Sequence, residues 1–119
     1  MKVAVSATGP ELTSTVDQRF GRARYFLVVD TPERSVRVVD NSPAVSATQG
    51  AGVQAAQAVI DSGAEALITG HCGPKAFRVL QAAGVKVYLN AQGTVEEALS
   101  QLETGQLVEA GAPDVESHW

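Results

Sequence analysis

Cysteine and long apolar runs are what this sequence has least of. Its 119 residues include one cysteine, Cys72, which cannot form a disulfide within the chain and cannot supply the four thiolates of an ordinary iron–sulfur site. No apolar run approaches the length of a membrane span, and Met1–Ser6 leads into a polar segment too early for a signal peptide. The sequence therefore predicts a soluble protein of the cytoplasm.

Aromatic and charged residues are also scarce. Aromatic residues make up 5% and charged residues 18% of the chain, whereas hydrophobic residues reach 45%. This composition predicts a globular domain whose core is built from small aliphatic side chains. The net charge of −4 argues against a nucleic-acid partner, because nucleic acids are usually bound by a basic face. A local basic pocket is still compatible with this net charge, because net charge does not say how the charges are distributed over the surface.

Helix and strand patterns predict one domain over residues 1–105, followed by a polar, acidic and loosely held tail over residues 106–119. Apolar or alternating runs predict strands at residues 2–6, 25–29, 36–40, 66–69 and 85–89. Helices are expected at about residues 53–62, 74–83 and 94–103. Their buried faces are expected to carry Val53, Ala56, Val59 and Ile60 in the first helix and Phe77, Leu80 and Ala83 in the second.

The order of these elements predicts the topology of the sheet. The second and third strands are separated by a tight turn at residues 31–35, which is typical of an antiparallel hairpin. Strands joined through helices should be parallel, with right-handed crossovers. We therefore expect an α/β fold of the ribonuclease-H-like, three-layer kind. It would have a mixed five-stranded sheet whose second strand is antiparallel, and three helices. Such a fold carries no function by itself.

Four loops are expected to meet at one edge of that sheet. Ligands of open α/β sheets collect at the carboxyl ends of the parallel strands. Residues 7–24, 41–52, 70–75 and 90–93 should all lie there, and they hold the glycine-rich segments that look functional. This edge is therefore the predicted binding site.

The first loop contains three arginines within six residues: Arg19, Arg22 and Arg24 stand around Phe20 and Gly21. The group could form a cationic lip that binds an anion, because guanidinium groups pair well with anionic groups. A solvated turn with charged flanks explains the same residues equally well, so the residues alone leave both interpretations open.

The second loop runs from Asn41 to Gly50 and Gly52, which precede a helix. Free N–H groups at a helix start can hold an anion. The pattern is weak, because two glycines before a helix more often only shape a turn. It also lacks the Gly-Lys-Ser/Thr of a phosphate-binding loop.

The third loop places His71, Cys72 and Gly73 directly before Pro74 and Lys75, at a helix start that is expected to lower the pKa of the thiol. Thiolate and imidazole are both ligands of transition metals. The competing interpretation is a buried cysteine that acts as a small hydrophobic residue, with a surface histidine beside it.

The stretch from Phe20 to Phe26 resembles the FGRAxYF signature of the dinitrogenase iron–molybdenum cofactor biosynthesis family, which includes NifX and the C-terminal domain of NifB. Residues 50–52, 70–77, 82–88 and 94–98 are similar to later blocks of that family. The likeness runs in register over about residues 2–105, which makes it more specific than any single motif. Many members have a histidine before Phe-Gly-Arg; Arg19 in its place favours anion pairing over metal ligation.

This resemblance implies a carrier, not an enzyme, that binds an anionic metal–sulfur cluster without covalent bonds. The cluster would be a molybdenum–copper sulfide or an iron–molybdenum cofactor-like species. Other cofactor-assembly or scaffold proteins would be its partners, with no nucleic acid and no membrane. Such clusters bring their own sulfide, so the host needs cations, N–H donors and an apolar wall. The implied binding residues are Arg19, Phe20, Gly21, Arg22, Asn41, Gly50, Gly52, His71, Cys72, Gly73 and Lys75, with Cys72 and His71 as candidate metal ligands.

Other function classes are compatible with the sequence. A nuclease on this fold would need a carboxylate cluster for two metal ions, but the first strand offers Ser6 and Thr8 where an acidic residue would be wanted. A Cys–His hydrolase would need the side chains of Cys72 and His71 in contact and a third group to orient them, and neighbours in a chain seldom point at each other. A signalling or scaffold module with a vestigial pocket is the remaining alternative.

Overall fold

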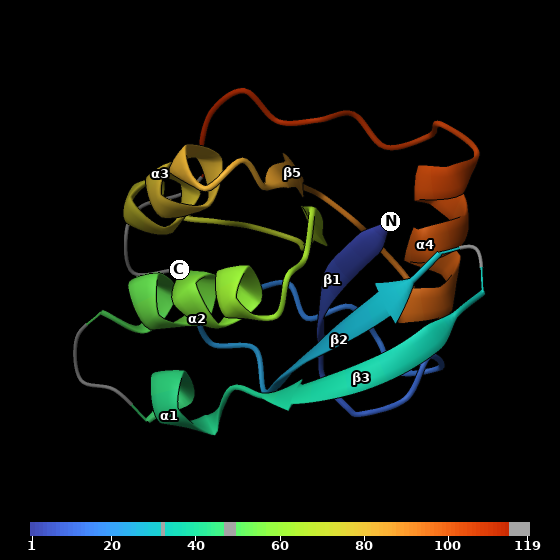
Figure 1. Ribbon diagram of the computed structural model, residues 1–119, viewed down its shortest axis with the longest axis horizontal. Coiled ribbons are helices and arrows are strands. Elements are labelled where there is room, and N and C mark those ends of the chain that lie inside the picture. The colour runs from blue at the N-terminus through green and yellow to red at the C-terminus, as the bar shows by residue number, and fades with distance from the viewer. Residues whose placement is uncertain (32, 47–49, 115–119) are drawn as a thin grey trace.

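The computed structural model of the chain describes residues 1–31, 33–46 and 50–114, and its centre is one five-stranded sheet (Figure 1). The strands lie in the order β3-β2-β1-β4-β5. They are β1 (Lys2–Ala7), β2 (Tyr25–Asp30), β3 (Ser35–Asp40), β4 (Ala66–Ile68) and β5 (Lys86–Tyr88). β2 is antiparallel to β1 and β3, whereas β1, β4 and β5 are parallel to one another. The predicted mixed sheet with a reversed second strand is confirmed.

Helices cover both faces of the sheet. α2 (Ala51–Asp61) and α3 (Pro74–Ala82) lie on one face, and α4 (Val95–Glu103) lies on the other (Figure 1). The described part of the chain holds four helices where three were predicted, because α1 (Ser42–Val45) forms within the expected second loop. Pro43 near its start favours helical backbone angles, and the Ser42 N–H donates to the Asp40 carboxylate at 2.8 Å. Pro32 of the predicted turn and residues 47–49 of the predicted loop lie outside the described residues.

The apolar core has two parts, one on each face of the sheet. Side chains alternate along a strand, so Phe26 and Val28 enter the core beneath α2 and α3, while Leu27 and Val29 enter the core beneath α4. Two expectations for the helices are wrong: Val53 is 38% exposed, and Ala83 is exposed as well. α2 packs on α3 and the sheet through smaller side chains instead; its buried residues are Ala51, Ala55, Ala56 and Val59.

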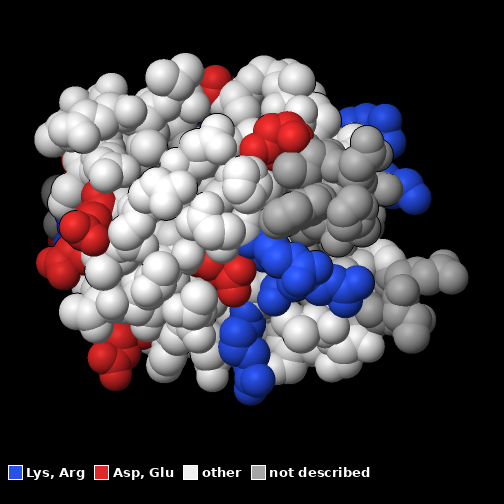
Figure 2. All heavy atoms as spheres, turned by 180° about the vertical axis from the view of Figure 1, so that it is seen from behind, with Lys and Arg blue, Asp and Glu red and all other residues white. Residues whose placement is uncertain are grey.

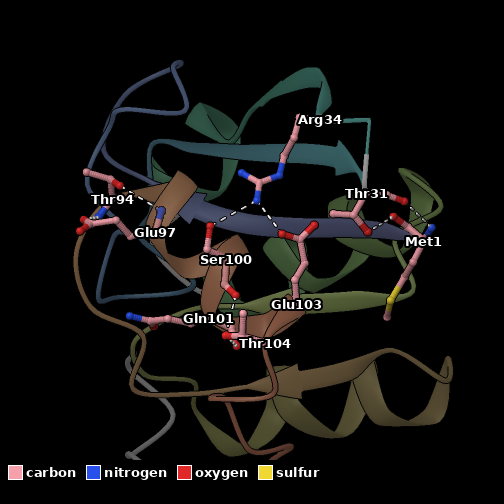
Figure 3. Close-up of polar contacts among 9 residues, drawn as sticks. All are labelled: Met1, Thr31, Arg34, Thr94, Glu97, Ser100, Gln101, Glu103 and Thr104. Atoms are coloured by element: carbon pink, nitrogen blue, oxygen red, sulfur yellow. Dashed lines mark hydrogen bonds and ion pairs between the residues drawn. The ribbon is translucent and has the colours of Figure 1, made fainter.

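α4 is fixed at both of its ends (Figure 3). At its start, the Thr94 hydroxyl accepts from the Glu97 N–H and the Glu97 carboxylate accepts from the Thr94 N–H, which is the predicted capping box. These bonds hold the pKa of Glu97 below its ordinary value. Near its end, the Arg34 guanidinium lies 2.6 Å from the Glu103 carboxylate, which ties the hairpin turn to the helix. None of the helices described here has the length and apolar character to cross a bilayer.

The C-terminal segment, residues 106–114, lies along the outer strand β5 and is attached to it. The Ala110 N–H donates to the Val87 carbonyl at 2.8 Å, and Glu109 forms a bridge with Tyr88. Leu107 packs on the core under α4, and Ala110 packs on the core under α2 and α3. The expectation of a loosely held tail is therefore wrong for residues 106–114, because the segment covers an otherwise open sheet edge. Residues 115–119 lie outside the described part, and a domain boundary at residue 105 stays a prediction.

Candidate functional site

Loops that follow β1, β4 and β5 lie together at the edge where these strands end; we call this the loop edge. The Phe20 N–H donates to the His71 carbonyl at 3.1 Å, and the His71 N–H donates to the Gln18 carbonyl at 2.7 Å. The loop after β5 joins them, since the Asn90 N–H donates to the Gly70 carbonyl at 2.8 Å. The expected convergence of these loops is present.

Phe20 anchors the first loop in the core and does not line the loop edge. Its side chain is fully buried, and its ring centroid lies 5.2 Å from that of Phe26. Gly21 is buried beside it, whereas Arg19 is exposed and Arg22 half-buried. The apolar anchor thus holds the flanking arginines at the loop edge, which a solvated turn would not do.

Arg22 and Asn41 connect the first loop to the second. The Arg22 guanidinium donates to the Val45 carbonyl at the end of α1, at 3.1 Å. The buried Asn41 side chain donates to the Ala23 carbonyl at 2.8 Å, and its backbone N–H donates to the Arg24 carbonyl. Asn41 was predicted as a binding residue; these bonds show that it holds the first loop in place, and a role in binding stays a prediction.

Two helices begin next to each other at the loop edge. A side-chain carbon added at Gly52, in the first turn of α2, would lie 3.4 Å from the Cβ of Ala76 in the first turn of α3. The N-cap residues are glycines, Gly50 and Gly73, so neither cap has a side-chain oxygen, and neither first turn contains an acidic residue. α4 has both features. The paired starts of α2 and α3 therefore combine two positive dipole ends that their own side chains do not neutralise.

Basic side chains gather on the same side of the molecule. Figure 2 shows the back face, where Lys and Arg lie toward the half that contains the loop edge and most Asp and Glu lie toward the other half. Lys75 is exposed in the first turn of α3. The acidic chain thus has a local basic region beside the helix starts, as its net charge allowed.

Cys72 lies at the loop edge but beneath its surface. The side chain is fully buried, and the thiol lies 3.6 Å from the Gly73 carbonyl. Burial, with a smaller effect of the nearby Asp114 charge, raises the pKa of the Cys72 thiol to about 12. The expectation that the helix start lowers this pKa is wrong, because loss of water around the thiolate outweighs the helix dipole. Cys72 is therefore a neutral thiol at physiological pH.

His71 and Cys72 are both bonded to Asp114, which lies 42 residues beyond Cys72. Asp114 Oδ2 is 2.8 Å from His71 Nδ1, and Oδ1 accepts from the Cys72 N–H at 3.1 Å. An ionised carboxylate only accepts hydrogen bonds, so with Asp114 ionised this contact is made by a His71 ring that has its proton on Nδ1. Asp114 was not predicted as a site residue, because no local pattern in residues 106–114 relates it to His71 and Cys72.

Gln18 was not predicted as a site residue either. Its side-chain amide donates to the Ala91 carbonyl at 2.9 Å, and its backbone carbonyl accepts from His71. It therefore links the loops after β1, β4 and β5. Across the described ranges, no three His, Cys, Asp or Glu side chains form a group that could hold a metal ion.

The chain is similar to several known proteins over most of its length. Residues 1–105 match the family model described as dinitrogenase iron-molybdenum cofactor. The apo form of the orange protein from Desulfovibrio gigas superposes with a TM-score of 0.94, at 44% identity and 96% coverage of both chains. A Thermotoga protein named as a candidate NifB protein gives 0.83, at 39% identity and 98% coverage of both. An uncharacterized protein of Methanocaldococcus jannaschii is 26% identical over 90% of this chain and 89% of its own.

Proposed function

Because the chain belongs to the dinitrogenase iron–molybdenum cofactor family, which it matches over residues 1–105, we propose that it binds and carries an anionic metal–sulfur cluster without covalent bonds. A molybdenum–copper sulfide and an iron–molybdenum–sulfur cluster are the two candidate cargoes. Both are anions whose metals already have sulfide ligands. The cargo would come from, and pass to, proteins that assemble cofactors.

The observation that carries this proposal is the pair of helix starts at the loop edge. α2 and α3 begin side by side with glycine caps and without acidic residues. Backbone N–H groups at such starts are donors for an anion, and their dipoles add favourable potential. A ligand set of this kind suits a cluster that brings its own sulfide better than a bare metal ion, which needs side-chain ligands from the protein.

The residues at the loop edge divide into donors, cations and supports. N–H groups at the starts of α2 and α3, that of Cys72 among them, would bond to sulfide, although Pro74 has no N–H to contribute. Gly52 gives the close approach of the two helices. Arg19, Arg22 and Lys75 would balance the charge, because cations next to an anion are worth more than neutral donors. The remaining candidates, Phe20, Gly21 and Asn41, would shape the loop that carries the arginines.

The state of Cys72 favours a cluster held by charge and N–H donors over one held by a sulfur ligand. A thiolate is the form that ligates metal ions, and here the thiol is buried with its pKa raised to about 12. His71, the other candidate ligand, has its Nδ1 atom bonded to Asp114. Ligation by Cys72 would require its burial to change, whereas ligation by His71 through Nε2 would leave the contact of Nδ1 with Asp114 in place.

We assign no catalytic role to the chain. The burial of Cys72 and the placement of the carboxylates argue against the two enzyme alternatives, a cysteine hydrolase and a nuclease. A cysteine hydrolase needs an exposed thiolate, whereas the Cys72 thiol is buried and neutral. A nuclease needs a carboxylate cluster, and the described residues form none. The strand order with β2 reversed supports the ribonuclease-H-like assignment of the fold. A cytoplasmic location stays a prediction.

Reconstitution of the purified protein tests this function. The protein is incubated with tetrathiomolybdate and a copper(I) salt, desalted, and examined for visible absorption and for molybdenum and copper per chain. We expect a coloured species at a fixed metal-to-protein ratio. Lys75→Gln should lower the affinity for it, whereas Lys86→Gln, an exposed lysine at the start of β5, should not. A colourless, metal-free wild-type protein would contradict the proposal.

A further inference from the structure

Asp114 of the C-terminal segment already occupies hydrogen-bond donors of the proposed binding site. Its two carboxylate oxygens bond to different groups, one to the imidazole of His71 at 2.8 Å and the other to the backbone N–H of Cys72 at 3.1 Å. Both donors lie just before the start of α3, which begins at Pro74. An anionic side chain thus lies among the groups that an anionic cargo would use.

We propose that Asp114 is an internal competitor of the cargo: its carboxylate holds the C-terminal segment on the loop edge, and binding of an anionic cluster displaces it. This inference rests on the proposed function and adds a form of regulation to it. Two anions cannot share one N–H donor at full strength, and like charges in one site repel. Any gain that the cargo makes from the Cys72 N–H therefore requires the carboxylate to leave.

The chain next to Asp114 is built so that it can leave without unfolding the domain. The last backbone hydrogen bond of the segment to the sheet is that of the Ala110 N–H with Val87. Of the backbone bonds described, none joins residues 111–113 to the body. Gly111 has open space around its Cα, and the side chains of His71 and Asp114 are 32% and 26% exposed. Release of Asp114 would thus cost its two polar contacts and little core packing.

The competition has a consequence for selectivity. A weak or singly charged anion gains too little at the helix starts to displace a carboxylate that is tethered to the same chain and so has a high effective concentration. A multiply charged cluster that also contacts Arg22 and Lys75 gains more from its additional charges. The C-terminal segment would therefore exclude small anions and admit the cargo.

The experiment compares variants that each remove one negative charge from the same segment. Asp114→Asn loses the charge and the bond to His71, and Asp114→Ala loses both bonds. Glu109→Gln is the matched control, because Glu109 is exposed and joins β5 through its backbone. Full-length proteins are titrated with tetrathiomolybdate, and binding is followed by its visible absorption. We expect both Asp114 variants to bind about tenfold more tightly than wild type, and Glu109→Gln to bind like wild type.

Amide NMR spectra give a second measurement that does not depend on affinity. Without a ligand, Asp114→Asn should shift the Cys72 amide signal, and addition of tetrathiomolybdate to wild type should raise the mobility of residues 111–114. Unchanged or weaker binding by the Asp114 variants, while wild type still binds, would overturn the competitor but leave the proposed function intact. Absence of binding by wild type and by every variant would overturn both the competitor and the proposed function. If Glu109→Gln binds tetrathiomolybdate as tightly as the Asp114 variants do, the gain in affinity comes from net charge alone, and the competitor is overturned as well.

Discussion

Gly70 lies directly against the backbone of Gln18. A side-chain carbon built on Gly70 would come within 2.5 Å of the Gln18 Cα and 2.7 Å of its carbonyl oxygen. The same carbonyl accepts the hydrogen bond from the His71 N–H. The first loop can therefore rest on the end of β4 only because this position has no side chain.

Gly70→Ala should disturb the loop edge, because two of the three nearest obstructing atoms belong to the Gln18 backbone and cannot rotate away. We expect a loss of stability of about 1–3 kcal/mol in urea unfolding, together with weaker binding of tetrathiomolybdate. Gly111→Ala is the control, since a carbon added there meets nothing within 4 Å. Equal stability of the two variants would mean that the first loop can shift at little cost.

Removal of Arg22 should weaken cargo binding more than removal of Arg37. Each guanidinium donates to a backbone carbonyl, Arg22 to Val45 and Arg37 to Ser62, so both Arg→Ala changes delete a charge and a bond of this kind. Only Arg22 belongs to the loop edge. We expect about a tenfold loss of affinity for Arg22→Ala by spectroscopic titration. Similar affinities for the two variants would remove the arginines from the proposed site.

Cys72→Ser distinguishes a cluster held by charge from one held by a sulfur ligand. Because the native thiol is neutral and buried, we expect the serine variant, after reconstitution with copper and tetrathiomolybdate, to show a spectrum and a metal ratio similar to wild type. Its affinity should fall modestly, since a hydroxyl in this apolar place packs less well. A folded variant that stays colourless and metal-free would show that the thiolate is a direct ligand.

The Cys72 thiol should also react slowly with iodoacetamide. Thiolate is the reactive form, and a pKa of about 12 leaves almost none of it at about pH 8. The expected rate is far below that of the urea-unfolded chain, and it should rise with pH toward that pKa. Mass spectrometry of the labelled protein measures it. A native rate equal to the unfolded rate would mean that the thiol is exposed in solution.

Folding should not depend on the cargo, and the cap of α4, which lies on the face of the sheet opposite α2 and α3, provides a test. Thr94→Ala removes the capping hydroxyl and should cost about 1 kcal/mol in urea unfolding of the apo protein. Thr104→Ala, at the other end of α4, removes an exposed hydroxyl that bonds to the Ser100 carbonyl and should cost less. Both variants should bind tetrathiomolybdate like wild type. An apo protein that unfolds without a cooperative transition would contradict this prediction.

The sheet, its reversed strand and the family were predictable because their signals are local or continuous. Runs such as residues 25–29 are rich in β-branched and aromatic residues, and the Thr94 capping box marks a helix start over four residues. α1 was not predicted, since four residues are too few to show a helical period. Val53 was assigned to a buried face by its helical spacing from Ala56 and Ile60, although the close approach of α2 and α3 turns a face richer in alanine toward the core.

The composition of the loop edge was predictable, but the direction of its side chains was not. Chain order brought Arg22, Gly50 and His71 to one edge of the sheet. Whether a side chain in a loop faces solvent or core depends on partners outside the loop. Phe20, for example, enters the core because its ring packs against that of Phe26. The burial of Cys72 and its contact with Asp114 have the same origin, because no local pattern relates residues that far apart.

The loop edge is assembled from segments spread over the whole chain, with hydrogen bonds that join Gln18 to Ala91 and Cys72 to Asp114. During synthesis the amino-terminal strands leave the ribosome first, the helix starts beside them follow, and residues 106–114 emerge after both. The complete loop edge, with Asp114 bonded to His71 and Cys72, can therefore form only after residue 114 has been added. A cluster that needs the complete loop edge would be loaded after these residues are synthesised and not during their synthesis.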